Sequence, residues 1–420
     1  MELLEAVDLS SSVSHGEAMA GCAVPEGRIR HETGMSGSGR GGCCTSRKAV
    51  GLAVSVLALL LSSCLPSIVV PGLEVKPGQW NAFRGGPSCQ AAHDDAPTPP
   101  LRLMWKHGAK GAIVSSPVIA DSTILLASLG EDVVALGLAD GAKQGALRAQ
   151  GAGAASPALL GHTLFIASEG KRYTLVAVNL RRGKRQWRRE LGDVSASPTG
   201  TQGVLLAGSH SGTVFALDAD SGDTLWSFDT GDQIHGSVAV FDTVVYAPST
   251  DHVLYAFSLS AGRRVWAVDL GAAVYTTPAL SETAAFLGTA DGTFYCLNRL
   301  DGTIRWRFKA EGPVYSSAAL ADQRVFFGCD DGAVYALWVE TGDLLWKFQT
   351  DGPVPASPVV TRNAVYVGSG DGVFYALEAA TGAELWRFET DGPIEASAAL
   401  SELGVYVGST DRCLYAFGPQ

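Results

Sequence analysis

Short apolar runs separated by turn residues recur from about residue 101 to the C-terminus. The stretch 351–390 shows the pattern clearly, because it contains the runs PVPASPVV, AVYVGS, VFYAL and ELWRF. Runs rich in Val, Tyr, Phe and Trp between turn residues are typical of β-strands. The pairs Asp371-Gly372 and Thr381-Gly382 predict tight turns between these runs, because glycine adopts positive φ at little cost. We therefore expect four antiparallel strands in each such unit and no helix of useful length.

The unit repeats with a period close to 40 residues. Seven of the copies carry a tryptophan at this spacing: Trp105, Trp187, Trp226, Trp266, Trp306, Trp346 and Trp386. In a degenerate copy, Leu147 lies 40 residues before Trp187, so it is predicted to take the tryptophan position there. A second marker, a Ser or Thr early in each unit, keeps the same spacing at Ser116, Ser156, Ser197, Ser237, Thr277, Ser317, Ser357 and Ser397. Repeats of this length indicate a solenoid or a propeller, and four strands per unit favour propeller blades.

The two ends of the repeat region complement each other. LRLMWKHG, at 101–108, looks like a fourth strand without its first three, whereas the last unit ends at VYVGSTDRCLYAF and lacks a tryptophan strand. Pairing these ends in one blade would close the ring and remove exposed sheet edges. We predict an all-β fold: an eight-bladed β-propeller of four-stranded antiparallel blades over 101–420, closed by its N- and C-terminal strands. The seven tryptophans are expected to dock blade on blade, because each buries a large apolar area.

An apolar stretch near the start indicates export. The run AVGLAVSVLALLL follows Arg47 and Lys48, and a helix of that length spans only about 20 Å, too short for a hydrocarbon core of about 30 Å. It ends in LSSC, which resembles the bacterial lipobox, so we expect cleavage between Ser63 and Cys64 and a lipid on Cys64. The alternatives are a transmembrane anchor or a stray apolar stretch.

These features divide the chain into four predicted regions. Because Met35 would begin a short basic leader, residues 1–34 are expected to be a start-site over-call or a disordered extension. Residues 35–63 are the predicted lipoprotein signal, 64–100 a lipidated tether with a lead-in segment, and 101–420 the propeller. The residue after the cysteine is Leu65 rather than an Asp, which by resemblance to the enteric sorting rule favours the outer membrane.

Charge and cysteine content exclude several classes of protein. The net charge is −11, whereas general nucleic-acid binders are basic. None of the eight cysteines forms a CxxC or CxxCH motif, so no zinc ribbon, c-type haem or other metal site is predicted. The sequence leaves open whether Cys296 pairs with Cys329, and it leaves open the state of Cys89 and Cys413. No catalytic nucleophile–His–acid group can be identified.

The repeat motif resembles a known family. ALDADSGDTLW (216–226), ALWVETGDLLW (336–346) and ALEAATGAELW (376–386) resemble the AxDxxTGxxxW signature of PQQ-like propeller repeats, and WNAFRGGP (80–87) resembles the segment that often precedes such propellers. One branch of that family comprises quinoprotein dehydrogenases, which bind pyrroloquinoline quinone (PQQ) with calcium and carry long insertions. The even period of this chain leaves no room for such insertions, and no Cys-Cys pair survives beyond residue 64.

The chain is more similar to the second branch, the BamB-type lipoproteins of outer-membrane protein assembly. That resemblance implies a non-catalytic, monomeric scaffold without a cofactor. It would be held at the outer membrane by its lipid, face the periplasm and bind an envelope protein partner, the β-barrel assembly machinery. No loop clearly matches the family's docking loops. The alternatives are a PQQ-dependent dehydrogenase, with PQQ and calcium, or a ligand-sensing propeller.

Two groups of side chains are candidate sites. His235, Tyr275, Tyr315 and Glu395 each lie two residues before the repeated Ser or Thr, so they could form a ligand patch on the central channel or merely pack between blades. Arg181, Arg182, Lys184 and Arg185 lie on a predicted hairpin before Trp187 and could meet anionic lipid or an acidic partner. The alternative for this basic group is a solvated face.

Overall fold

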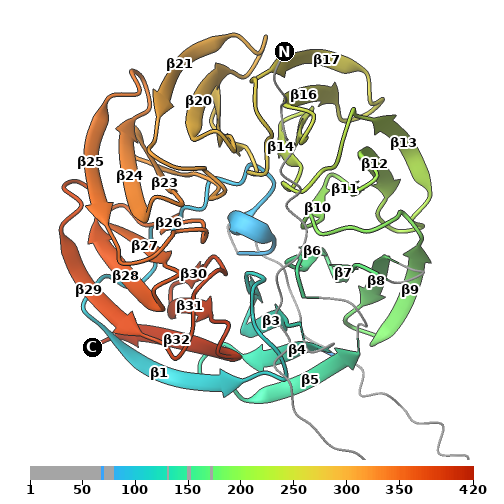
Figure 1. The fold of residues 1–420 in the computed structure, drawn as a ribbon. Coiled ribbons are helices and arrows are strands. Elements are labelled where there is room, and N and C mark those ends of the chain that lie inside the picture. The colour runs from blue at the N-terminus through green and yellow to red at the C-terminus, as the bar shows by residue number, and fades with distance from the viewer. Residues whose placement is uncertain (1–67, 71–79, 130–131, 149–152, 171–173) are drawn as a thin grey trace, which may run out of the picture. The chain divides into compact units, whose positions relative to one another are not determined.

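Eight four-stranded antiparallel sheets surround a common axis (Figure 1). The computed structural model describes residues 68–70, 80–129, 132–148, 153–170 and 174–420, all of which belong to one compact unit, Leu61–Gln420. Within these residues the only helix is the short 3-10 helix η1 (Phe83–Gly85), which lies at the centre of the ring. The predicted eight-bladed all-β propeller is confirmed.

Seven blades take their strands from one continuous stretch of chain, ordered from the axis outward. The first three blades consist of β2 (Val118–Ala120), β3 (Thr123–Ala127), β4 (Asp132–Gly137) and β5 (Lys143–Arg148); β6 (Ala158–Leu160), β7 (Thr163–Ala167), β8 (Leu175–Asn179) and β9 (Lys184–Arg189); and β10 (Thr199–Thr201), β11 (Val204–Gly208), β12 (Thr213–Asp218) and β13 (Thr224–Asp229). The next two consist of β14 (Ala239–Phe241), β15 (Val244–Pro248), β16 (Val253–Ser258) and β17 (Arg264–Asp269); and β18 (Ala279–Leu280), β19 (Ala284–Gly288), β20 (Thr293–Asn298) and β21 (Ile304–Lys309). Blades 6 and 7 consist of β22 (Ala319–Ala321), β23 (Arg324–Gly328), β24 (Ala333–Trp338) and β25 (Leu344–Gln349); and β26 (Val359–Val360), β27 (Ala364–Gly368), β28 (Val373–Glu378) and β29 (Glu384–Glu389).

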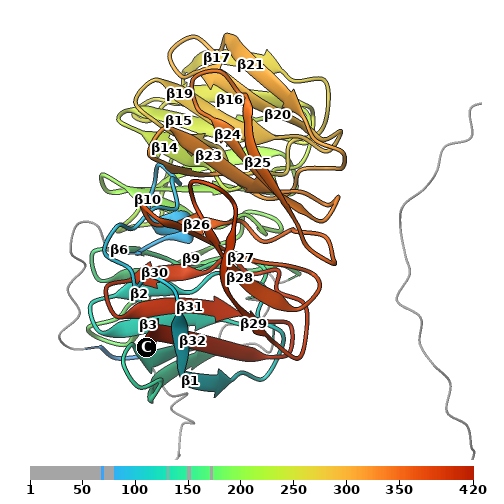
Figure 2. The ribbon, with the colours of Figure 1, turned by 90° about the vertical axis from the view of Figure 1, so that its left-hand side faces the viewer.

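The eighth blade joins the two ends of the propeller. It contains β30 (Ala399–Ser401), β31 (Gly404–Gly408) and β32 (Cys413–Pro419), and its outermost strand is β1 (Leu101–Gly108). Strand β1 lies beside β32 (Figure 2). The two strands run antiparallel, with Trp105 opposite Ala416. The predicted closure by the terminal strands is thus confirmed.

The innermost strands are shorter than the apolar runs that predicted them. Of PVPASPVV, only Val359–Val360 forms strand β26. The preceding residues bond to a neighbouring blade instead, since the Ser357 amide donates to the Ser397 hydroxyl at 3.2 Å. The same link from an amide to the next blade's hydroxyl runs through the whole series of repeated Ser and Thr residues, Ser116, Ser156, Ser197, Ser237, Thr277, Ser317, Ser357 and Ser397. The Ser/Thr marker is therefore a set of links between adjacent blades.

Six of the seven repeat tryptophans dock on the repeat motif of the next blade. The Trp346 indole N–H donates to the Ala379 carbonyl at 3.1 Å, and its ring lies against Gly382, where an added Cβ would come within 2.6 Å of the ring. Gly382 has φ 76°, which also favours glycine. The same bond joins five other pairs: Trp105–Leu138, Trp187–Ala219, Trp226–Leu259, Trp266–Arg299 and Trp306–Val339. Trp386, beside the closing blade, packs on Phe417 with ring centroids 5.0 Å apart.

The prediction that Leu147 takes the tryptophan position in blade 1 is wrong. Gly145 pairs with Ala135 across β4 and β5, just as Trp346 pairs with Ala336 in blade 6. Leu147 lies two residues further on, because simple counting by forty ignores the different length of this copy. The motif glycine gives the right register, since Gly141 precedes Gly145 by four residues, as Gly342 precedes Trp346.

The N-terminal segment Ile68–Val70 occupies the joint that lacks a tryptophan. Ile68 is fully buried in an apolar cluster built from blade 1 and blade 2, together with Val118 and Leu164. The Val70 amide donates to the Leu180 carbonyl at 2.9 Å. In the repeat, Leu180 corresponds to Ala379, so a backbone N–H replaces the indole N–H found at the other joints. The chain ahead of the repeats thus completes the joint between blades 1 and 2.

Removing one docked indole tests the role of the joints. Trp346→Ala is expected to lower the free energy of unfolding by about 3–5 kcal/mol, since Trp346 is only 7% exposed and loses both packing and a hydrogen bond. Urea unfolding followed by circular dichroism measures this. The control is Leu344→Ala in the same strand, where the side chain is 49% exposed and a change below about 1 kcal/mol is expected.

A second substitution tests the segment that replaces the missing indole. Ile68→Ala is expected to cost about 2–5 kcal/mol, because a fully buried side chain leaves a cavity between two blades. Val69→Ala, at a neighbouring position that is 39% exposed, should leave the midpoint nearly unchanged. Equal midpoints for the two variants would contradict the role given to Ile68.

Candidate functional site

A lead-in segment, residues 80–91, closes one end of the central channel. Its backbone carbonyls accept amide N–H groups from the inner strands of six blades, at Ile119, Leu159, Val240, Leu280, Leu320 and Val360. Arg84 is 1% exposed and donates to the carbonyls of Cys89 and Ala318. Burial lowers the pKa of Arg84 to about 10, which leaves it charged at neutral pH. The segment is thus an integral part of the ring.

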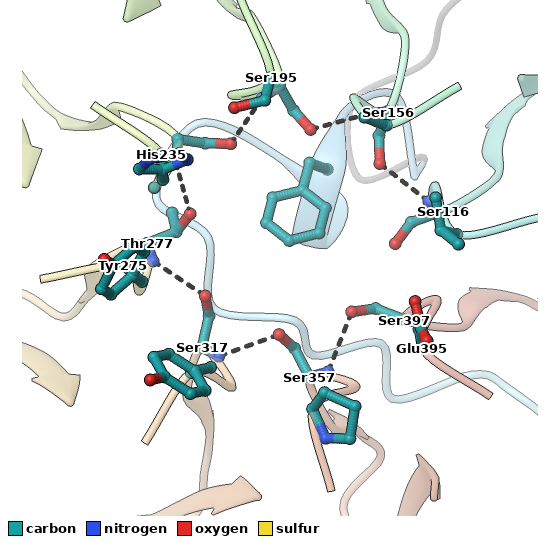
Figure 3. Close-up of a pocket in the computed structure, with 18 residues that line it drawn as sticks. Ser116, Ser156, Ser195, His235, Tyr275, Thr277, Ser317, Ser357, Glu395 and Ser397 are labelled. Atoms are coloured by element: carbon teal, nitrogen blue, oxygen red, sulfur yellow. Dashed lines mark hydrogen bonds between the residues drawn. The ribbon is translucent and has the colours of Figure 1, made fainter. Parts of the chain in front are cut away.

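A cavity of about 200 Å³ lies on the axis against this segment (Figure 3). Phe83 lines it, together with the repeated Ser and Thr residues and the side chains two positions before them. The structure therefore brings the four predicted patch residues His235, Tyr275, Tyr315 and Glu395 to one cavity. Tyr275 and Tyr315 are 38% and 40% exposed, so they border the open space as well as packing on neighbouring side chains.

Three rings that line this cavity, and a fourth beside them, form an arc. Ring centroids are 4.6 Å apart for His210 and His235, 5.2 Å for His235 and Tyr275, and 5.4 Å for Tyr275 and Tyr315. His210 was not among the predicted residues. It follows Ser209 in the turn between the second and third strands, a position that is variable in this sequence, and only the fold brings that turn beside the next blade. The four residues come from separate turns and loops but form one continuous surface, which we call the axial arc.

Two residues of the axial arc, His235 and Tyr315, have shifted pKa values that favour their neutral forms. Burial, and next the proximity of His210, lower the pKa of His235. Burial, and then the charge of Asp330, raise the pKa of Tyr315. The arc therefore offers ring faces and hydroxyl or imidazole hydrogen bonds, which suit stacking against a planar or polar group.

The arrangement around His210 differs from a catalytic triad. The Ser195 hydroxyl lies 2.5 Å from His210 Nε2, and the Glu169 carboxylate lies 3.9 Å from that same nitrogen. In a triad the carboxylate bonds to the other ring nitrogen and orients the imidazole. The contacts of His210 thus do not position Ser195 as an activated nucleophile.

Comparison with known proteins places the chain in a family. The family model described as "Outer membrane protein assembly factor BamB" matches residues 101–209, 210–347 and 301–420, which together cover the whole propeller. The chain belongs to the BamB family. This match confirms the resemblance of the tryptophan repeats to PQQ-like propellers of the BamB type.

The individual BamB proteins that match this chain have low sequence identity to it. The outer membrane protein assembly factor BamB of Moranella endobia (strain PCIT) is 28% identical over 146 residues, a match that covers 31% of this chain and 37% of that protein. The chain thus aligns with little more than a third of that relative's length.

Among solved structures, BamB from Moraxella catarrhalis matches with a TM-score of 0.62 and 19% identity, over 76% of this chain and 99% of that one. A europium-containing methanol dehydrogenase matches with a TM-score of 0.67 and 14% identity, over 82% and 98%. The designed protein Ika8 gives a TM-score of 0.67 and 16% identity, over 74% and 98%. At these identities the structural matches show a shared propeller fold and nothing more specific.

The predicted basic group lies apart from the axial arc. Its four side chains are exposed on the β8–β9 hairpin at the outer edge of blade 2: Arg181 and Arg182 in the turn, and Lys184 and Arg185 at the start of β9. Ser63 and Cys64 lie outside the described residues, so the lipid site stays a prediction. In the described part of the BamB-family chain, no helix is long and apolar enough to cross a membrane and no group of His, Cys, Asp or Glu is arranged to hold a metal ion.

The described cysteines are free thiols. Cys89, Cys296, Cys329 and Cys413 form no disulfide, which settles the open question of a pair between Cys296 and Cys329. Burial raises the pKa of both of these thiols to about 12, so they remain protonated at neutral pH. They pack as small apolar groups within blades 5 and 6.

The axial arc predicts a pH effect on stability. Because the pKa of His235 is lowered in the folded state, the unfolded chain binds its proton more readily, and stability falls as pH drops below the unfolded value of about 6.5. His235→Gln should reduce the loss of melting temperature between about pH 7.5 and pH 5. His252→Asn, at an exposed turn, is the control and should keep the wild-type loss. An unchanged loss in His235→Gln would show that His235 is not the group whose protonation destabilises the ring.

Proposed function

We propose that this chain is a lipid-anchored, non-catalytic scaffold that binds an envelope protein partner in outer-membrane β-barrel assembly. The observation that carries the proposal is the BamB-family match over the whole of residues 101–420. The propeller would face the periplasm, held at the outer membrane by a lipid on Cys64. The lipobox-like LSSC sequence at 61–64 supports this anchor.

The regular blades support a scaffold role. Apart from the lead-in segment 80–91 at one end of the channel, the described residues contain only short connections between strands and no long insertion. No such insertion is therefore available among the described residues to close over a substrate and exclude water during a reaction. Such a ring is suited to holding other proteins against its surface.

The axial cavity fits PQQ with calcium poorly. PQQ is a flat molecule with three carboxylates, yet no Lys or Arg lines the cavity and its volume is about 200 Å³, below the usual range for ligand sites of about 300–1,000 Å³. Calcium takes six to eight oxygen ligands and favours carboxylates, and Glu395 is the one acid in the lining. These features support a propeller that works without this cofactor.

Crosslinked affinity purification from membranes tests the proposed partner. We expect the full-length tagged chain to recover subunits of the β-barrel assembly machinery after crosslinking in intact cells. A variant that unfolds, such as one with several joints disrupted, controls for non-specific capture. Repeated absence of the machinery from the crosslinked material would contradict the proposal.

A separate variant tests the anchor. Cys64→Ser is expected to move the protein from the membrane fraction to the soluble fraction, because it removes the thiol that would carry the lipid. Cys413→Ser is the control and should leave the distribution unchanged. Retention of Cys64→Ser in the membrane fraction would show that another element holds the protein there.

A further inference from the structure

We propose that the β8–β9 hairpin of blade 2 docks on anionic phospholipid and so determines which face of the ring turns toward the membrane. This inference rests on the proposed lipid at Cys64. It assigns a function to Arg181, Arg182, Lys184 and Arg185, which no part of the scaffold role uses.

The hairpin lies beside Ile68–Val70, a segment that follows the predicted anchor closely in the sequence. Leu180, whose carbonyl accepts the Val70 amide at 2.9 Å, is directly followed by Arg181. Ile68 is fully buried at the same joint and comes only four residues after Cys64 in the sequence. Four residues of extended chain span at most about 14 Å. A lipid on Cys64 would therefore keep this joint, and the hairpin beside it, close to the membrane surface.

The hairpin also carries a concentrated positive charge. The four basic side chains are exposed, and within the described residues none of them has an ion-pair partner, whereas nearby Arg189 pairs with Asp223 at 2.7 Å. The Arg182 amide donates to the Asn179 side chain at 3.0 Å, which shapes the turn and leaves the cationic groups outside it. The group stands out in a chain of net charge −11. An anionic surface complements it.

Proximity to the anchor favours lipid over an acidic protein partner. A basic group near a membrane gains about fivefold in affinity for each Lys or Arg beside anionic lipid. The short link to Cys64 would keep this hairpin near the membrane, where that gain can be realised. A protein partner would need no such proximity to the anchor.

The docking would orient the whole ring. In each blade the turn between strands 3 and 4 lies beside the turn between strands 1 and 2, as the bond from the Leu180 amide to the His162 carbonyl shows. The turns between strands 2 and 3, including His210 of the axial arc, lie at the opposite ends of the strands. The face with the axial arc would thus point away from the membrane, toward partners.

Vesicle binding by the full mature chain tests the proposal. Cys64→Ser protein, which carries no lipid, is mixed at low salt with vesicles of phosphatidylcholine alone or with about one quarter phosphatidylglycerol. We expect binding to the anionic vesicles only. Lys184→Glu/Arg185→Glu should weaken it at least tenfold, and salt should abolish it.

The chain offers a matched control. Arg263 and Arg264 occupy the same two positions after the turn glycine in blade 4 and are also exposed, so Arg263→Glu/Arg264→Glu changes the net charge equally. This variant should bind anionic vesicles within about twofold of the parent protein. The reason is that the hairpin of blade 2 carries four charges and is the proposed lipid contact, whereas the hairpin of blade 4 carries only two charges. Equal losses in the two variants would overturn the proposal, since net charge alone would then explain them.

Two other outcomes would also overturn it. One is binding that does not depend on phosphatidylglycerol. The other is unchanged vesicle binding by Lys184→Glu/Arg185→Glu together with reduced recovery of a crosslinked protein, which would assign the hairpin to an acidic partner. Because the assay uses unlipidated protein, its result is independent of cell fractionation with Cys64→Ser, so failure of the anchor and failure of the docking surface can be told apart.

Discussion

The joint between adjacent blades is the contact on which the ring depends. The hydrogen-bonded ladder of each sheet ends at the edges of its blade, so the ladders cannot hold one blade to the next. Side chains supply much of that cohesion. Near the axis, a hydroxyl accepts an amide from the preceding blade, as in Ser317 to Ser357; at the rim, an indole docks on a carbonyl and a turn glycine, as in Trp346 on Ala379 and Gly382.

The joint between blades 1 and 2 departs from this scheme and links the fold to the proposed anchor. With Gly145 at the tryptophan position, the joint would lack both an apolar filler and a donor for the Leu180 carbonyl. Ile68 provides the first and the Val70 amide the second. A segment that the sequence predicts to belong to the tether is therefore part of the propeller core, and a lipid on Cys64, as proposed, would be only four residues from Ile68.

Much of the fold could be predicted from the sequence because its determinants are local and repeated. Turn pairs such as Asp371-Gly372 delimit the strands, and the terminal fragments 101–108 and 413–420 complement each other without any knowledge of the fold. The tryptophan register in blade 1 was wrong because counting residues cannot detect a copy of different length. The burial of Ile68 and the proximity of His210 to His235 could not be foreseen, since each depends on contacts between segments that share no pattern in the sequence.

The completion of one blade joint by residues ahead of the repeats is tested most directly by hydrogen exchange measured by mass spectrometry. Ile68→Ala should be compared with Val69→Ala under native conditions. Faster exchange is expected in Ile68→Ala, concentrated in the peptides of blades 1 and 2 (118–189), with blade 5 (279–309) little changed. Equal exchange in the two variants, or an increase spread evenly around the ring, would contradict the role of Ile68 at this joint.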